Sequence, residues 1–348
     1  MIISANRVTL LGSIVIALTL SGCTSSAPRP VQPGPVAGQV WPSPPAEPRI
    51  RLLRIFSAPD DLGIKKGFFQ KLGEFFAGGS DYRLIRPMSV LVGEEGAIYV
   101  ADPGAKGVHR FDMKRGRHRL IQRQERSPLP SPVGLARGPQ GRIYVSDSFL
   151  NAVYEILPGE SEARPLKLEA ELHQPTGIAF APEDGGLYVV DTERHRVVVF
   201  NRDGSLRGTL GKRGTGDGEF NFPTMIWRQP DGRLLVTDSL NFRIQIFDAS
   251  GRFLGKFGKL GDGTGYLSRP KGVATDSFGH VYVVDALFHA VQVFDGQGQL
   301  LLHFGTQGRA PGEFWLPAGI YVGENDTIYV ADSRNQRVQV FRYIGGQP

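Results

Sequence analysis

The stretch Ile98-Tyr99-Val100-Ala101-Asp102 is the first of six copies of one short pattern, an apolar strand that ends in aspartate. The other copies are Ile143–Asp147, Leu187–Asp191, Leu234–Asp238, Val281–Asp285 and Ile328–Asp332. Successive aspartates are separated by 45, 44, 47, 47 and 47 residues. A repeat of about 40–50 residues with several short β-rich runs is typical of a β-propeller, in which each repeat forms one four-stranded blade. The sequence therefore predicts an all-β, six-bladed β-propeller.

The fourth repeat shows the expected strands of a blade most clearly. From the innermost strand outward, they are predicted at residues 224–228, 233–237, 243–247 and 253–257. Turn-forming residues separate them, such as the run Gln229-Pro230-Asp231-Gly232. Within Arg243–Phe247 polar and apolar side chains alternate, which predicts a strand with one buried and one more exposed face.

The sixth repeat ends at Phe341, after its third strand, and lacks an outermost strand of its own. The N-terminal stretch Arg51–Phe56 resembles the outermost strand of the fourth repeat, Arg252–Phe257, in its placement of apolar and basic residues. We expect this N-terminal strand to pair with the last blade and close the ring, because closure removes an open sheet edge.

Two stretches, Asp238–Phe247 and Asp332–Phe341, resemble the Asp-x-x-Asn-x-Arg-(Val/Ile)-Gln-(Val/Ile)-Phe core of NHL repeats. The linkers at 257–266 and 304–314 are also similar to that family, and the resemblance spans roughly residues 50 to 343. It implies a propeller of the NHL type. Three repeats depart from the pattern, because they carry Gly107, Ala152 and Ala290 where it has arginine. An inter-blade ion pair made by this arginine is therefore expected in only half of the ring.

Residues 1–22 are arranged like a secretory signal, in which one basic residue, Arg7, is followed by the apolar run Val8–Leu20. The following residues, Leu20-Ser21-Gly22-Cys23, resemble a bacterial lipobox and imply that Cys23 is a lipidated N-terminal residue. The alternative for this single cysteine is a small buried apolar side chain. Eight prolines in residues 24–48 predict a semi-extended tether. We therefore expect a lipid-anchored protein of the bacterial cell envelope. By analogy with enteric sorting rules, Thr24 after the cysteine favours the outer membrane, with the protein on its periplasmic or surface side.

The expected organisation is a signal peptide at 1–22, a lipidated cysteine and tether at 23–48, the propeller at 49–343 and a tail at 344–348. One segment, Leu62–Gly79, interrupts the repeats. Its apolar residues, among them Phe68 and Phe75, recur at helical spacing and predict a short amphipathic helix. This helix is expected to pack over one end of the ring. Docking on a partner or on the membrane is the alternative.

The formal net charge is +6, and removal of residues 1–22, which contain one basic residue, leaves +5. In a cytosolic protein this charge would suggest nucleic acid as a partner. An exported protein instead meets anionic lipid, cell-wall polymer or acidic protein surfaces, so we expect no nucleic-acid partner and allow an anionic ligand. Solvated surface charge that keeps the protein soluble is the alternative.

One face of a propeller collects two kinds of loop, those between second and third strands and those that enter the next innermost strand. On this face we expect a partner-binding set made of Arg194, His195, Arg196, Asn241, Phe242, Arg243, Phe288, His289, Trp315, Arg334, Asn335 and Arg337. The incoming linkers add Lys212, Arg213, Arg269 and Lys271. Basic side chains interleaved with aromatic ones are typical of surfaces that recognise acidic groups.

A structural alternative exists for three arginines of this set. Arg196, Arg243 and Arg337 could pair with the repeated aspartate or with carbonyls of adjacent blades. The six aspartates recur in every blade, whereas a catalytic acid or a metal ligand is needed once or twice. We therefore expect the aspartates to cap turns by accepting hydrogen bonds from backbone amides.

No catalytic set is recognisable in the sequence. Peptidyl-hydroxyglycine amidating lyases, a related six-bladed family, have zinc-binding histidines at several innermost strands. The corresponding positions here are Pro87-Met88, Pro132-Val133, Pro175-Thr176, Pro223-Thr224, Pro270-Lys271 and Pro317-Ala318, and none has histidine. The glycine-rich runs Gly214–Gly218 and Gly261–Gly265 do not open a helix, which argues against phosphate binding. We expect no enzyme, no metal and no cofactor.

The sequence thus predicts a membrane-anchored scaffold of the bacterial cell envelope. Its basic, aromatic-containing propeller face would be presented to another envelope protein or complex. Two alternatives stay open, a metal-dependent lyase or lactone hydrolase that uses the central channel, and a binder of anionic polysaccharide.

Overall fold

The computed structural model describes residues 38–64 and 82–345. The predicted signal peptide, Cys23 and most of the predicted amphipathic helix lie outside these residues. In the part that is described, no helix has the length and apolar character needed to cross a membrane.

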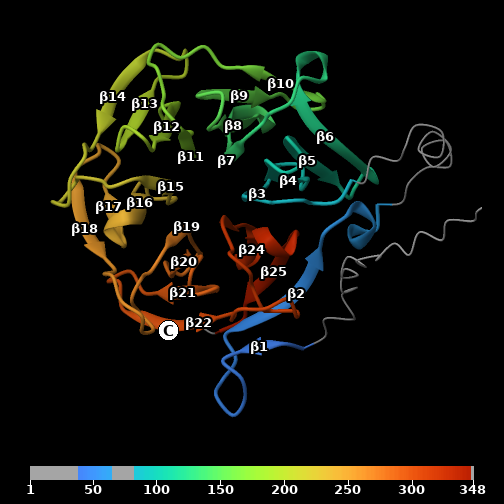
Figure 1. Ribbon diagram of the computed structural model, residues 1–348, viewed down its shortest axis with the longest axis vertical. Helices are drawn as coiled ribbons and strands as arrows, with labels where there is room; N and C mark the ends of the chain where they lie inside the picture. The colour runs from blue at the N-terminus through green and yellow to red at the C-terminus, as the bar shows by residue number, and fades with distance from the viewer. Residues whose placement is uncertain (1–37, 65–81, 346–348) are drawn as a thin grey trace, which may run out of the picture. The chain divides into compact units, whose positions relative to one another are not determined.

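Antiparallel strands are arranged as blades around a central channel (Figure 1). Blade 1 consists of β3 (Ser89–Val92), β4 (Ile98–Asp102), β5 (Gly107–Asp112) and β6 (Arg117–Arg123). Blade 2 consists of β7 (Pro132–Arg137), β8 (Ile143–Asp147), β9 (Ala152–Ile156) and β10 (Glu162–Pro165). Blade 3 consists of β11 (Pro175–Ala181), β12 (Gly186–Asp191), β13 (Arg196–Phe200) and β14 (Leu206–Leu210).

The remaining blades follow the same order from the channel outward. Blade 4 consists of β15 (Pro223–Arg228), β16 (Leu234–Asp238), β17 (Arg243–Phe247) and β18 (Phe253–Phe257). Blade 5 consists of β19 (Pro270–Thr275), β20 (Val281–Asp285), β21 (Ala290–Phe294) and β22 (Leu300–Phe304). Blade 6 combines β23 (Ile320–Val322), β24 (Thr327–Asp332) and β25 (Arg337–Tyr343) with the N-terminal strands β2 (Ile50–Phe56) and β1 (Val40–Trp41).

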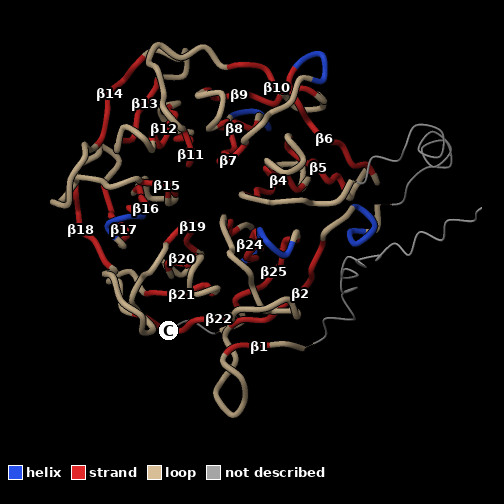
Figure 2. Tube along the Cα trace, in the orientation of Figure 1, coloured by secondary structure: helices blue, strands red, loops and turns tan. Residues whose placement is uncertain are grey.

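Helical structure in the described residues is limited to short 3₁₀ turns, which lie in the connections between strands (Figure 2). These turns are η1 (Pro59–Leu62), η2 (Gln124–Arg126), η3 (Pro139–Gly141), η4 (Ser239–Asn241), η5 (Glu324–Asp326) and η6 (Ser333–Asn335). The all-β propeller predicted from the repeats is confirmed, and the four strands of blade 4 lie within one residue of their predicted bounds.

The two ends of the chain close the ring. β2 pairs antiparallel with β25, from Ile50 opposite Tyr343 to Phe56 opposite Val338. This pairing confirms the predicted closure by an N-terminal strand. β1 then adds to the outside of β2, so that the sheet has the order β1-β2-β25-β24-β23.

The structure differs from the prediction that the propeller begins at residue 49. The ring of Trp41, in β1, lies 6.0 Å from that of Phe304 and 5.7 Å from that of Phe341. The last residues of the predicted tether are therefore part of the packed blade, because an indole side chain among phenylalanines buries a large apolar area.

Blades 1 and 2 form one continuous eight-stranded sheet. Their outermost strands, β6 and β10, pair in parallel through Gln122 opposite Glu162 and Arg123 opposite Ala163. No other pair of neighbouring blades in the described ring is joined in this way.

Burial follows the position of a strand within its blade. Every residue of the second strands β8, β16 and β20 is buried, because these strands lie inside a blade that neighbouring blades cover on both sides. The outermost strands β18 and β22 alternate between more and less exposed residues. The exposed face predicted for Arg243–Phe247 is wrong, since Arg243 and Gln245 are also buried.

Two histidines, the buried His109 and the half-buried His118, lie side by side in blade 1. His109 in β5 occupies the register position that Gln245, Gln292 and Gln339 hold in blades 4 to 6. Its Nδ1 lies 2.9 Å from Nε2 of His118, and its Nε2 lies 3.7 Å from an oxygen of Asp102. Burial lowers the pKa of His109 to about 4, because the interior disfavours the charged imidazolium.

We therefore expect the protein to lose stability in mild acid. His109 titrates near 6.5 when unfolded and at about 4 when folded, so its contribution is complete above pH 6.5 and is lost as pH falls toward 4. One such group changes the free energy of unfolding by at most about 1.4 kcal/mol per pH unit. His109→Gln should flatten the slope measured by urea unfolding between pH 7 and pH 4.5. His303→Gln, on the exposed edge of β22, is the matched control, and equal slopes in both variants would contradict the assignment.

Candidate functional site

The six repeated aspartates are fully buried at one end of the blades. Each carboxylate accepts a hydrogen bond from a backbone N–H of the linker that enters its own blade. The donors are Ile85 and Arg86 for Asp102, Ser131 for Asp147, His173 for Asp191, Asn221 for Asp238, Ser268 and Arg269 for Asp285, and Trp315 for Asp332. Backbone amides of the turn also donate to Asp102, Asp147 and Asp285, which confirms the expected turn-capping role in blades 1, 2 and 5. These bonds hold the linkers and the turns after the second strands on the same face of the ring.

Three arginines of the predicted partner-binding set belong to this framework. The Nε atoms of Arg196, Arg243 and Arg337 lie 2.9, 2.8 and 2.7 Å from Asp191, Asp238 and Asp332. The ion pair is made within one blade, not between blades as expected. The Arg243 guanidinium also donates to the carbonyls of residues 215, 216 and 219 in the linker from blade 3. Only 6% of Arg243 is exposed, so a partner cannot reach it.

The two predicted site histidines connect neighbouring blades. Nδ1 of His195 accepts the backbone N–H of Phe222 at 3.0 Å, and Nδ1 of His289 accepts that of Leu316 at 3.0 Å. Phe222 and Leu316 both have a φ of 49°, a left-handed conformation that is costly for large side chains. Burial lowers the pKa of both histidines, which favours the neutral ring that an accepting Nδ1 requires.

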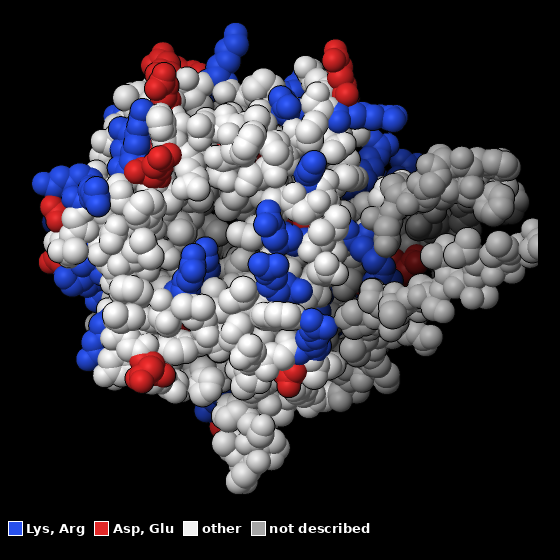
Figure 3. Space-filling view, viewed as in Figure 1, with Lys and Arg blue, Asp and Glu red and all other residues white. Residues whose placement is uncertain are grey.

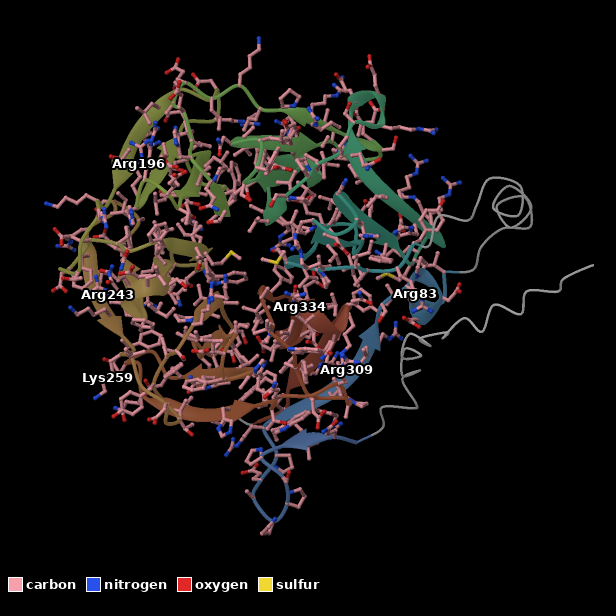
Figure 4. All side chains as sticks on the ribbon, viewed as in Figure 1. Arg83, Arg196, Arg243, Lys259, Arg309 and Arg334 are labelled. Atoms are coloured by element: carbon pink, nitrogen blue, oxygen red, sulfur yellow. The ribbon has the colours of Figure 1, made fainter. Side chains whose placement is uncertain are left out.

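The other residues of the predicted partner-binding set differ in how accessible their side chains are to a partner. Asn241 and Asn335 donate to Asp238 and Asp332 at 2.8 and 2.9 Å and serve the framework. Phe242 and Phe288 are half-buried, and Trp315 lies under the Arg309 guanidinium, 4.7 Å from its ring centre. Arg194 is exposed and donates to the Glu171 carbonyl. Arg334 is exposed beside the central channel, whereas Arg196 and Arg243 lie farther out (Figure 4).

A cavity of about 300 Å³ lies where the innermost strands begin. Every blade contributes the residue that follows the proline at that point, namely Met88, Val133, Thr176, Thr224, Lys271 and Ala318. Linkers and turns of the same face add Arg86, Pro103, Ser131, Ser148, Gln174 and Met225. Figure 3 shows the hollow from this side, with basic side chains around it and acidic ones nearer the edge of the disc. The cavity is thus the mouth of the central channel.

The polar lining of the channel mouth consists of cations, hydroxyls and one amide. The pKa of Lys271 is lowered, first by burial of its ammonium group and then by the nearby charge of Arg269. Neither Lys271 nor the Arg86 side chain makes an ion pair within the described ranges, although arginines elsewhere in the ring do. Hydroxyls pair beside them, with 2.8 Å between Ser131 and Ser148.

The lining does not fit a divalent metal ion. Its described residues offer no carboxylate and no imidazole, which are the groups that bind zinc, calcium or magnesium in proteins. In residues 38–64 and 82–345, no group of three or more His, Cys, Asp or Glu side chains is placed to hold a metal. The metal-dependent form of the enzyme alternative therefore has no support in the channel mouth.

Sequence reasoning noted Lys271 among the linkers but missed Arg86, Gln174 and Thr176 as members of a site. The proline that starts each innermost strand was a usable signal, because the residue after it lines the channel in all six blades. The lack of histidine at these six positions hides the other polar groups that they carry. Read together, they already place a lysine and two threonines around one axis.

The ring of blades, its closure by an N-terminal strand and the buried aspartate at each second strand define the class of protein as a β-propeller. The NHL repeat model matches residues 172–200 and 314–341. Both segments contain the ion pair between arginine and the buried aspartate described above. The protein is an NHL-repeat β-propeller.

Similar proteins have several functions. A gluconolactonase of Zymomonas mobilis subsp. mobilis is 27% identical over 119 residues, which are 30% of this chain. The match spans about a third (33%) of that relative's length. Virginiamycin B lyase from Staphylococcus aureus has a TM-score of 0.55 at 16% identity, covering 74% of this chain and 95% of that one. An auxiliary nutrient binding protein from Bacteroides thetaiotaomicron has a TM-score of 0.61 at 13% identity, covering 76% and 71%. The two structural likenesses show the fold.

The prediction that the chain is not an enzyme is wrong. It rested on the lack of a recognised catalytic motif, yet part of the chain matches a gluconolactonase. Propellers place functional groups around a channel from several blades, so a local motif is not required for chemistry.

Proposed function

We propose that this protein is a lipid-anchored binding protein of the bacterial cell envelope, and that its channel mouth binds an anionic group of its partner or ligand. The observation that carries the proposal is that two cations, Arg86 and Lys271, lie in the cavity without an ion pair to any described residue, and that no carboxylate is among the described lining residues. The envelope location rests on the lipobox-like sequence before Cys23.

The energetics favour an anion at this place. Like charges that converge in a partly buried cavity repel one another, and burial penalises the ammonium further, as the lowered pKa of Lys271 reflects. An incoming carboxylate would relieve both costs and accept charge-assisted hydrogen bonds, which are about twice as strong as neutral ones. The free cations Arg269 and Arg334 on the same face would attract it from a distance.

The neighbouring polar groups suggest that the anion also carries hydrogen-bonding atoms. Ser131, Thr176 and Gln174 present two hydroxyls and an amide to the cavity wall. A carboxylate with adjacent hydroxyls, as in a sugar acid, suits this lining. An acidic side chain of an envelope protein and an anionic polysaccharide present related chemistry.

We expect gluconate or the dicarboxylate glutarate to bind the wild-type protein in a calorimetric titration. Lys271→Met should weaken that binding at least tenfold, because a hydrogen bond to a charged group contributes about 1.5–3 kcal/mol and about 1.4 kcal/mol is a factor of ten. Lys259→Met, at the outer edge of the disc (Figure 4), should leave it unchanged. Absence of binding by both anions, or equal loss in both variants, would refute the proposal.

A second candidate function is lactone hydrolysis, which the match to a gluconolactonase favours. In this scheme the neutral amine of Lys271 takes a proton from water as the water oxygen bonds to the lactone carbonyl carbon. Arg86 stabilises the oxyanion that forms there. The ring C–O bond then breaks, and its oxygen takes the proton from Lys271.

The hydrolysis candidate is tested with gluconolactone as substrate, by following acid release at constant pH with the spontaneous rate subtracted. Retained activity in Lys271→Met would exclude the scheme, whereas selective loss relative to Lys259→Met would support it. Unchanged stability of both variants in urea is the required control.

A further inference from the structure

Large, exposed apolar side chains lie on the loops of the same face as the channel mouth. The second residue after the buried aspartate is Phe149 in blade 2, Leu240 in blade 4 and Leu287 in blade 5, and these are 74%, 44% and 49% exposed. The linkers add Ile85 and Phe222, which are also exposed. We call these five side chains the apolar collar. Several of them adjoin cavity residues in the chain, as Phe149 follows Ser148 and Ile85 precedes Arg86.

The collar continues where a blade lacks a side chain of its own. In blade 1 the position equivalent to Phe149 is Gly104, and a Cβ there would lie 2.6 Å from Cγ2 of Ile85. Ile85 therefore occupies the space that the missing side chain leaves. The equivalent residues of blades 3 and 6 are the charged Glu193 and Arg334. Four of six blades thus present an apolar group around the basic cavity.

The backbone beneath the collar is fixed. The N–H groups of Phe149 and Leu287 bond to the buried carboxylates of Asp147 and Asp285 at 3.0 and 3.1 Å. Phe222 is held by the His195 hydrogen bond, and the two rings lie 4.5 Å apart at 69°. A surface that is already ordered loses little conformational entropy on binding, which is a property of good docking surfaces.

From these observations we propose that the apolar collar docks a protein partner, and that this partner inserts an acidic side chain into the channel mouth. The inference rests on the proposed anion binding and deepens it by naming the class of partner. In protein interfaces, apolar anchor residues exclude water around a buried charged pair. The apolar collar around the basic cavity has the same arrangement.

Charge complementarity and shape favour a protein over the other anionic partners. A polysaccharide offers hydroxyls and carboxylates but no apolar groups to cover Leu240 and Leu287. A bilayer would accept the collar, yet its headgroups form a broad surface, whereas Lys271 is recessed in the cavity and half-buried. A single projecting aspartate or glutamate reaches the Lys271 cation, while the apolar residues that flank it on the partner cover the collar.

The test is site-specific photo-cross-linking in cells that make the full-length protein from its own gene. In the variant Phe149→benzoylphenylalanine we expect an adduct with one protein, and the cross-linked peptide should contain Asp or Glu among apolar residues. Adding Lys271→Met should reduce the adduct at least fivefold. Leu301→benzoylphenylalanine, on the outer strand β22 with exposure equal to that of Leu287, is the control and should give no such adduct.

Several outcomes would overturn the inference. These are no adduct at Phe149, an adduct with lipid or glycan, a peptide without an acidic residue, or a yield that Lys271→Met does not change. The docking inference and the anion-binding proposal can be refuted independently. If gluconate or glutarate binds wild-type protein and a Phe149→Ser, Leu287→Ser variant equally while no protein is cross-linked, only the docking inference is wrong. If neither anion binds and no acidic peptide is cross-linked, anion binding itself is wrong.

Discussion

Asp238→Ala should lower the free energy of unfolding by about 3–5 kcal/mol, the range seen when one partner of a buried ion pair is removed. Asp238 is fully buried and accepts bonds from Asn221 N, Asn241 Nδ2, Arg243 Nε and Gln245 Nε2 at 2.7–3.0 Å. The alanine variant leaves the Arg243 guanidinium buried without its counter-charge. It also frees the linker between blades 3 and 4. Urea unfolding followed by tryptophan fluorescence measures the loss.

Asp248→Ala provides a matched control for this prediction. Asp248 caps the turn between β17 and β18 of the same blade, where it bonds to Ser250 and Arg252 near the surface. Water can replace those bonds, so the loss should be much smaller. Equal losses in the two variants would mean that the buried aspartate has no special role in the blade.

Removal of residues 1–57 should prevent the ring from folding as a stable monomer. β2 contributes Ile50, Leu52, Ile55 and Phe56, all buried, to blade 6. At about 1.5–3 kcal/mol for each buried side chain, their loss amounts to roughly 6–12 kcal/mol. This approaches the whole stability of a typical protein, about 5–15 kcal/mol. The deletion also leaves β25 as an open edge that can pair with other chains.

A synthetic peptide of residues 38–57 should restore the truncated protein in trans. Circular dichroism and analytical ultracentrifugation would show the return of a monomer with native β content. The same peptide with Leu52→Asp should fail, because it places a charge at a fully buried position opposite Phe341. A chain that starts at residue 38 should fold unaided. A stable, monomeric chain lacking residues 1–57 would contradict the closure mechanism.

The fold was largely predictable because its signals are local. Each blade repeats an apolar strand that ends in aspartate, and turn residues mark the strand ends, so the strands of blade 4 were placed within one residue. Closure was predictable because the last repeat lacked one strand. Pairing of β6 with β10 was not, since nothing in either segment indicates a parallel partner 40 residues away. The short strand β1 was hidden in a proline-rich run.

The site was less predictable, for two physical reasons. Arg243 and Arg337 have the same residue type whether they face a partner or a buried aspartate, and only the three-dimensional position of the linker decides between these roles. The cations and hydroxyls of the channel mouth come from all parts of the ring and become neighbours only on closure. Each repeat contributes a single residue after its proline to the site. The site is therefore recognisable only when the six repeats are aligned.

The outermost place of β1 has a consequence for how such a ring is suspended. Blade 6 has the order β1-β2-β25-β24-β23 from the circumference to the channel, and β1 lies at the outer edge of the disc (Figure 1). The chain therefore enters the propeller at its circumference, away from both openings of the channel. In the lipid-anchored arrangement proposed above, the ring would turn about a single peripheral pivot. Its channel face would then be free to meet a partner, with the bilayer to one side.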